Sequence, residues 1–114
     1  MSKRDTRLLL EDILESCEKI TSYTKGLNFE TFVSDDKTLD AVVRNFEIIG
    51  EAANRIPDSF CNQYAEISWH QMIGMRNRLI HAYFGVDYSI IWDVVENSLP
   101  LFKKQISGIL LHEL

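Results

Sequence analysis

Apolar residues recur along most of the chain at the three- and four-residue spacing of an amphipathic helix, and no useful run alternates in the manner of a strand. The pattern predicts four long helices, over about residues 4–25, 37–56, 69–83 and 88–112, and a short helical piece around 60–65. Short connections between them favour an all-α fold, an antiparallel four-helix bundle, formed as one domain over residues 1–114.

Polar and special residues between the apolar runs predict where these helices begin and end. A loop over 26–36 closes with cap candidates for the second helix, which Pro57 prevents from continuing. Ser68-x-x-Gln71 is typical of a capping box at the start of the third helix, and Asp87 can cap the last one. Pro100 lies inside that last helix, where the apolar period resumes beyond it, so we expect a kink there.

Composition and charge narrow the class of protein. Apolar residues make up 46% and charged residues 25%, as in a soluble globular domain. Cys17 and Cys61 lie far apart and form no C-x-x-C, which favours reduced thiols in a cytoplasmic protein. The apolar run 8–10 is too short for a signal peptide or a membrane span. The net charge of −5 disfavours non-specific binding to nucleic acid but permits a local basic cleft.

Arg76 breaks the pattern, because it falls within the apolar stripe of the third predicted helix. Such an arginine either extends to water or pairs with a carboxylate, or it binds an anion in a cleft, since an unpaired buried charge is costly. Glu47 and Glu51 of the second helix are the expected counter-ions, and Gly50 there should permit close helix packing. The polar face of that helix carries a ladder of both charges, which is commonly solvated: Arg44, Glu47, Glu51 and Arg55.

His81 and Tyr83 follow Arg76 along the same predicted helix. Tyr83 lies seven residues on, about 20° from Arg76 around the helix axis, so the two share a face. His81 lies about 140° away, where a lone histidine is usually only solvated. Arg76 and His81 therefore meet at one phosphate only if the helix loosens near His81 or a second copy completes the site. Ile48, apolar and outward-facing, also hints at a dimer or partner contact.

The spacing Arg76-Asn77-x3-His81-x-Tyr83 resembles the R-x4-H-x-Y signature of ribonucleases of the HEPN superfamily. The surrounding residues 72–87 and the segment 39–52 are similar to HepT-type toxins, and the likeness covers nearly the whole chain. Ala82 stands where many relatives carry an acidic residue, which alters the charge expected near His81.

The resemblance implies a homodimer whose two motif helices line a shared cleft and cleave RNA without a metal or other cofactor. Arg76 would hold the scissile phosphate, His81 would transfer protons for attack by the 2′-hydroxyl, and Asn77 would orient the phosphate or the imidazole. The resemblance also implies a type VII-like toxin–antitoxin pair, of the kind formed by HepT and MntA. Its minimal nucleotidyltransferase antitoxin would attach AMP to Tyr83, placing a blocking phosphate near Arg76.

Two other interpretations stay open at this point. The chain could be a non-catalytic helical module that offers Tyr83 as an acceptor to a nucleotidyltransferase, or an inert scaffold, which leaves the place of Arg76 unexplained. Neither a Gly-rich phosphate loop nor a nucleophile elbow is present, and the histidines lack the spacing of metal ligands: His70, His81 and His112. No metal, cofactor, DNA or membrane partner is expected.

Overall fold

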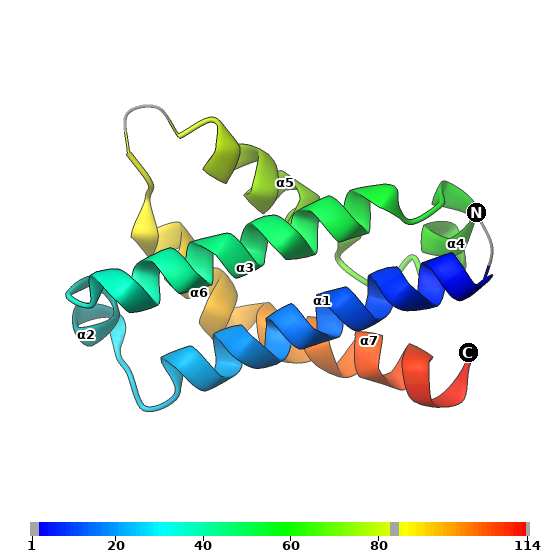
Figure 1. The fold of residues 1–114 in the computed structure, drawn as a ribbon, viewed down its shortest axis with the longest axis horizontal. Helices are drawn as coiled ribbons and strands as arrows, with labels where there is room; N and C mark the ends of the chain where they lie inside the picture. The colour runs from blue at the N-terminus through cyan, green and yellow to red at the C-terminus, as the bar shows by residue number, and fades with distance from the viewer. Residues whose placement is uncertain (1–2, 83–84, 114) are drawn as a thin grey trace.

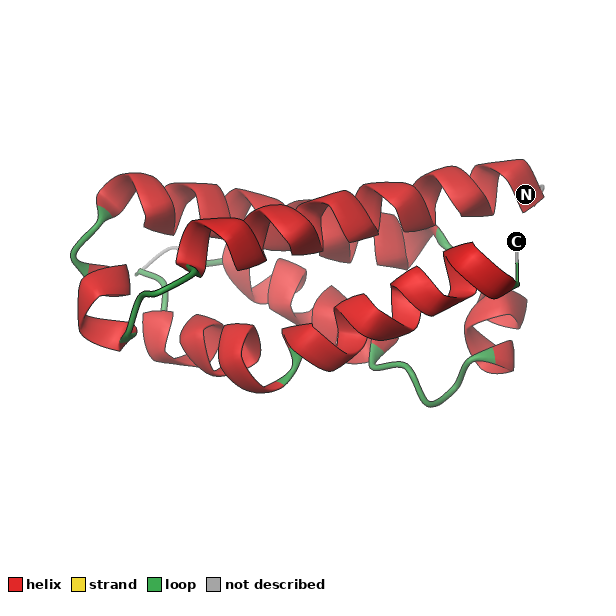
Figure 2. Ribbon diagram, turned by 90° about the horizontal axis from the view of Figure 1, so that it is seen from below, coloured by secondary structure: helices red, strands yellow, loops and turns green. Residues whose placement is uncertain are grey.

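The computed structural model describes residues 3–82 and 85–113, and every regular element in these ranges is a helix (Figure 2). The prediction of an all-α fold is therefore confirmed. The helices are α1 (Lys3–Thr24), α2 (Phe29–Val33), α3 (Asp36–Arg55), α4 (Asp58–Gln63), α5 (Trp69–Ile80), α6 (Tyr88–Asn97) and α7 (Leu99–His112).

The long helices form an antiparallel bundle in which α3 is central (Figure 1). α3 packs against α1 on one side and against α5 on the other, while α7 packs against α1 and continues from α6. The short helices close the two ends, α2 at the turn between α1 and α3 and α4 near the chain termini (Figure 1). The arrangement leaves one face of α3 between α1 and α5, and the candidate site forms there.

The apolar faces of the helices meet in one core, as their periodicity predicts. Each helix of the bundle contributes side chains that are less than a tenth exposed, and burial of each large aliphatic or aromatic side chain stabilises the fold by about 1.5–3 kcal/mol. The residues predicted to face inward and found buried include Leu9, Leu10, Ile13, Cys17 and Ile20 of α1; Leu39, Val42, Phe46, Ile49 and Ala53 of α3; Ile91, Val94, Leu99, Phe102, Ile106 and Ile109 of α6 and α7.

The prediction of one kinked last helix was wrong, because the chain forms two helices that meet at Ser98. Ser98 ends α6 and begins α7, and Pro100 lies in the first turn of α7. A proline lacks an N–H and clashes with the preceding turn, but in a first turn that N–H has no intrahelical partner anyway. The apolar period resumes because a new helix starts.

The predicted capping box at Ser68 does not form, although Ser68 does precede the first residue of α5. The side chain of Gln71 instead donates a hydrogen bond from Nε2 to Oγ of Ser98, 3.0 Å away. That bond ties the start of α5 to the junction of α6 and α7. The edge-on contact of the Trp69 and Phe102 rings, 6.1 Å between centroids, anchors the same end of α5.

A short helix, α2, occupies part of the segment expected to be loop. Asn28 and Thr31 form a reciprocal capping box: the Asn28 Oδ1 accepts from the Thr31 N–H at 2.8 Å, and the Thr31 Oγ1 accepts from the Asn28 N–H at 2.9 Å. The buried Phe32 ring packs on Trp92, 4.9 Å between centroids, which holds the helix against α6. Asp35, one of the expected cap candidates, then begins α3 by accepting from the Thr38 N–H.

Candidate active site

Arg76 lies where α5 packs closely on α3, at Gly50. A Cβ at Gly50 would overlap the Cβ of Arg76 and come within 2.8 Å of the carbonyl oxygen of Met72. Gly50 is buried in α3, so the close packing expected at this glycine is confirmed. The contact with Gly50 of α3 thus fixes where the Arg76 side chain lies in the α3–α5 interface.

The guanidinium of Arg76 is held from two sides. Its Nη2 lies 2.8 Å from the Oε2 of Glu51 in α3, and its Nη1 donates to the Oδ1 of Asn77 at 3.0 Å. The Arg76 side chain is 27% exposed, so the charge lies at the edge of the interface rather than within the core. A guanidinium has five N–H donors, and those not used by Glu51 and Asn77 remain for an anion.

The ladder expected along α3 is not present. Among the described residues neither Arg44, Glu47 nor Arg55 forms an ion pair, and Glu51 pairs across the interface with Arg76. Of the two carboxylates considered as counter-ions, only Glu51 contacts Arg76 within these ranges. Arg44 and Arg55 of α3 are therefore without an ion pair among the described residues, whereas Arg76 has one.

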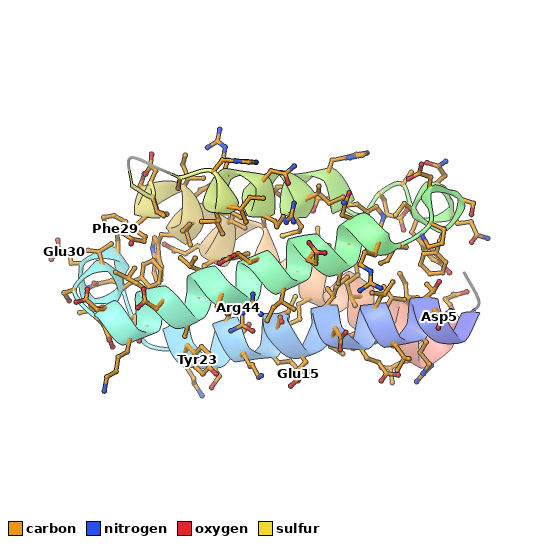
Figure 3. All side chains as sticks on the ribbon, turned by 45° about the horizontal axis from the view of Figure 1, so that its top comes forward. Asp5, Glu15, Tyr23, Phe29, Glu30 and Arg44 are labelled. Atoms are coloured by element: carbon orange, nitrogen blue, oxygen red, sulfur yellow. The ribbon has the colours of Figure 1, made fainter. Side chains whose placement is uncertain are left out.

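These side chains line a groove between α1, α3 and α5, which we call the Arg76 groove, with a volume of about 290 Å³. Figure 3 shows Arg44 on the side of α3 that faces α1. The groove is lined by apolar residues, among them Ile48 and Ile80, and by charged residues of both signs: Asp12, Arg44, Glu47, Glu51, Arg55 and Arg76. The contribution of α1 was not foreseen, because no local pattern reports how two helices pair.

α5 ends earlier than its pattern predicts. Its last residue is Ile80, and His81 follows as the C-cap with φ −108° and ψ 18°, outside the helical ladder. The helix thus ends before the exposed His81, so Arg76 and His81 are not held about 140° apart by one straight helix. The prediction that Arg76 and Tyr83 share a face required a helix to residue 83, and α5 ends at Ile80. Tyr83 itself lies outside the described residues.

Burial acts on both cysteine thiols of this fold. Burial raises the pKa of the Cys17 thiol to about 12 and also raises the pKa of the Cys61 thiol, so neither favours the reactive thiolate. Within residues 3–82 and 85–113 there is no group of three or more His, Cys, Asp or Glu side chains placed to hold a metal ion. In the same ranges no helix has the length and apolar content needed to span a bilayer.

Comparison with known proteins identifies the family. The family model described as "Ribonuclease HepT-like" matches residues 13–109. The chain belongs to the HepT-like ribonuclease family. The HEPN resemblance drawn from the motif is thereby confirmed. No solved structure matches the chain.

Three relatives with ribonuclease names match over more than nine-tenths of their own length. A protein of Methanocaldococcus jannaschii that carries the provisional name of an RNase is 44% identical over 110 residues, covering 96% of this chain and 91% of its own. A Thermococcus cleftensis protein named "Probable ribonuclease HepT" is 46% identical over 101 residues, covering 89% and 92%. A Caldanaerobacter subterraneus protein, also with a provisional RNase name, is 43% identical over 107 residues, covering 94% and 96%.

Proposed function

We propose that this HepT-like protein is an endoribonuclease that cleaves RNA without a metal ion. The observation that supports it most is the guanidinium of Arg76, held by Glu51 and Asn77 at the edge of a groove with N–H donors left for a phosphate. His81 follows at the end of the same helix. Family membership and the RNase names of the relatives support RNA as the substrate.

The chemistry divides between two catalytic residues. Arg76 binds the scissile phosphate and stabilises the charge that develops on its oxygens. His81 accepts the proton of the 2′-hydroxyl, whose oxygen attacks phosphorus while the bond to the 5′-oxygen breaks; an imidazolium returns a proton to that leaving oxygen. The products are a 2′,3′-cyclic phosphate and a 5′-hydroxyl. Because the nucleophile is the 2′-hydroxyl, DNA is not a substrate. Asn77 is a supporting residue that orients Arg76.

The proposal includes a homodimer, in which a second copy brings its own motif to the cleft. The Arg76 groove supports this, because its lining combines apolar residues with Arg44, Glu47 and Arg55, which make no ion pair within the described chain. Ile80, 39% exposed, adds a large apolar side chain to that face. In a twofold interface a residue away from the axis meets a different residue of the other copy, so a surface with charges of both signs can pair with itself.

We further propose that the chain is the toxin of a type VII-like toxin–antitoxin pair in the cytoplasm. A minimal nucleotidyltransferase would act as its antitoxin, with Tyr83 as the acceptor. The hydroxyl of Tyr83 would attack the α-phosphate of ATP and release pyrophosphate, leaving AMP on the tyrosine oxygen. The added phosphate would repel RNA and compete for the guanidinium of Arg76. Reduced thiols at Cys17 and Cys61 suit that compartment.

Cleavage of RNA by the purified chain in the presence of EDTA tests the central claim. Arg76→Ala and His81→Ala should each lower the cleavage rate by about 100-fold or more. Arg78→Ala is the matched control, because it removes the same charge from the exposed face of α5. Cleavage that stops with EDTA, or that persists in both variants, would refute the proposal.

Mass measurement tests the alternative in which the chain is a non-catalytic module that offers Tyr83 to a nucleotidyltransferase. Intact mass after incubation with the nucleotidyltransferase and ATP should rise by one or more AMP groups, and Tyr83→Phe should remove the rise. Modification of Tyr83 together with no cleavage by the unmodified chain would favour the non-catalytic module over the ribonuclease.

A further inference from the structure

A second hollow lies on the same seam between α3 and α5, on the side toward the N-terminal end of α5, and we call it the Asp58 cavity. Its volume is about 370 Å³. Ile73 and His70 in its lining precede Arg76 by three and six residues, which at the helical rise places them about 4.5 and 9 Å from it along the axis. One nucleotide spans such a separation between its base and its phosphate.

The floor of the Asp58 cavity is apolar and its rim is polar. Ala53, Ile56 and Trp69 are all less than a tenth exposed and form the floor. The rim groups come from three separate elements: Asn54 near the end of α3, Asp58 and Asn62 of α4, and His70 of α5. Polar groups that converge on a concave site of about 300–1,000 Å³ are the feature by which small-ligand sites orient what they bind.

The four rim side chains have hydrogen-bonding capacity that the described part of the chain does not use. None of Asn54, Asp58, Asn62 and His70 makes a side-chain hydrogen bond or ion pair within residues 3–82 and 85–113. The lining includes one carboxylate and neither lysine nor arginine. Such a rim does not suit a phosphate, but it suits a neutral ligand that presents hydrogen-bond donors.

We propose that the Asp58 cavity binds a guanine base of the RNA substrate, next to the phosphate held by Arg76. This inference rests on the proposed ribonuclease function and adds base recognition to it. Single-stranded RNA is read by hydrogen bonds to base edges together with contacts to base faces. Guanine presents two adjacent donors, N1–H and the N2 amino group, which one carboxylate, that of Asp58, accepts together. The amides of Asn54 and Asn62 can donate to its O6 and N7 acceptors.

The other bases match this rim less well. Adenine and cytosine each present one amino group beside an acceptor nitrogen, which faces the carboxylate unfavourably, and uracil presents a single N–H between two carbonyls. A carboxylate that meets an acceptor loses its own hydrogen bonds with water and gains none, which disfavours the wrong base. The recognition is therefore assigned to guanine rather than to purines in general.

Binding can be tested without cleavage by titrating the whole chain with 2′-O-methyl GpG, ApA, CpC and UpU. The chain has two tryptophans, so two indole N–H signals report on separate places. Trp69 lines the cavity, whereas Trp92 packs on Phe32 near α2 and serves as an internal control. GpG should shift the Trp69 signal at a concentration at least tenfold lower than the other three dinucleotides and leave the Trp92 signal in place.

Asp58→Asn should weaken GpG binding at least tenfold, since an amide cannot accept two donors together. Asp40→Asn is the matched control, because Asp40 is an exposed carboxylate on α3 outside the cavity lining. Asn54→Ala gives a second variant in case the first turn of α4 depends on Asp58. Equal shifts of Trp69 with all four dinucleotides, no shift with any, or undiminished GpG binding by both cavity variants would overturn the proposal.

Cleavage of a random-sequence RNA pool separates this inference from the function on which it rests. The wild-type chain should cut mainly at positions adjacent to guanine, and Asp58→Asn should relax that preference at least tenfold while cleavage continues. Cleavage by the wild type with no preference for guanine would overturn base recognition and leave the ribonuclease in place. Absence of any wild-type cleavage would refute the ribonuclease, and the titration would still decide whether the cavity binds guanine.

Discussion

Replacing Gly50 by alanine probes the contact that sets the position of Arg76. The added methyl group would overlap the Cβ of Arg76 and lie 2.8 Å from the carbonyl oxygen of Met72. Neither atom can rotate away, because one is backbone and the other is the first atom of its side chain. α5 must therefore move off α3, which also separates the guanidinium of Arg76 from Glu51.

The expected cost follows from two opposing effects. Forcing an extra methyl group into a packed interface typically costs about 1–3 kcal/mol. Alanine is a better helix former than glycine by about 0.8–1 kcal/mol, which offsets part of that cost. The difference is about 0–2 kcal/mol, and we expect the upper end because neither overlapping atom can move aside: Gly50→Ala should lower the free energy of unfolding by about 2 kcal/mol and reduce RNA cleavage by more than the loss of folded protein explains.

Urea unfolding followed by circular dichroism measures the stability change, and cleavage assays at a temperature where the variant is folded measure the activity. Gly74→Ala is the matched control: it lies on α5, and a Cβ there would meet nothing within 4 Å. That control should gain up to about 1 kcal/mol from helix propensity. If Gly50→Ala proves as stable as the wild type, the close approach of α3 and α5 does not position Arg76 as argued.

Three further predictions concern other contacts. Glu51→Gln should lower kcat/KM for RNA about tenfold while changing the unfolding free energy by less than about 1 kcal/mol, as for exposed ion pairs; a large loss of stability would contradict it. Hydrogen bonds at the helix starts, above all from the Thr38 and Ser89 hydroxyls, lower the pKa of Asp35 and of Asp87 respectively. The stability that these two carboxylates contribute is therefore present above the unfolded pKa of about 3.9 and is lost as the pH falls through their lower folded values. Below pH 4 the free energy of unfolding should therefore depend less on pH in the Asp35→Ala, Asp87→Ala double variant than in the wild type; the same dependence in both would rule this out. Iodoacetamide, followed by mass spectrometry, should modify the half-buried Cys61 before Cys17, and modification of Cys17 should require unfolding; simultaneous modification of the folded protein would refute the assignment.

The long helices and their inward faces were predictable because both depend on local periodicity. The end of α5 was not, since Tyr83 and Phe84 continue the apolar spacing in the sequence although the helix ends at Ile80. The division of the last helix at Ser98 was missed for a related reason: two helices in the same direction can continue one apolar period. Local pattern therefore predicts which segments are helical better than where they stop.

The candidate site was predictable in part. Arg76 stood out because its charge falls on an apolar stripe, and Glu47 and Glu51 were both plausible partners since they share a face of α3. Choosing between them requires the register of α5 on α3, which the close approach at Gly50 sets. The Asp58 cavity gave no signal at all, because its rim comes from three elements that meet only in the folded chain.

The packing of α5 has a consequence for the dynamics of this protein. Among the described residues α3 contacts α1 and α5 extensively, whereas α5 contacts only α3 extensively, and Trp69 and Gln71 add contacts at its first turns. Local openings follow the least-anchored elements. The least-anchored part of α5 is the turn beyond Arg76, where Asn77, Arg78 and Ile80 are exposed, and this turn can therefore open while Arg76 stays packed on α3. In hydrogen exchange these amides should lose protection well before those of α3, so the reactive end of the molecule would be a separate unit of opening.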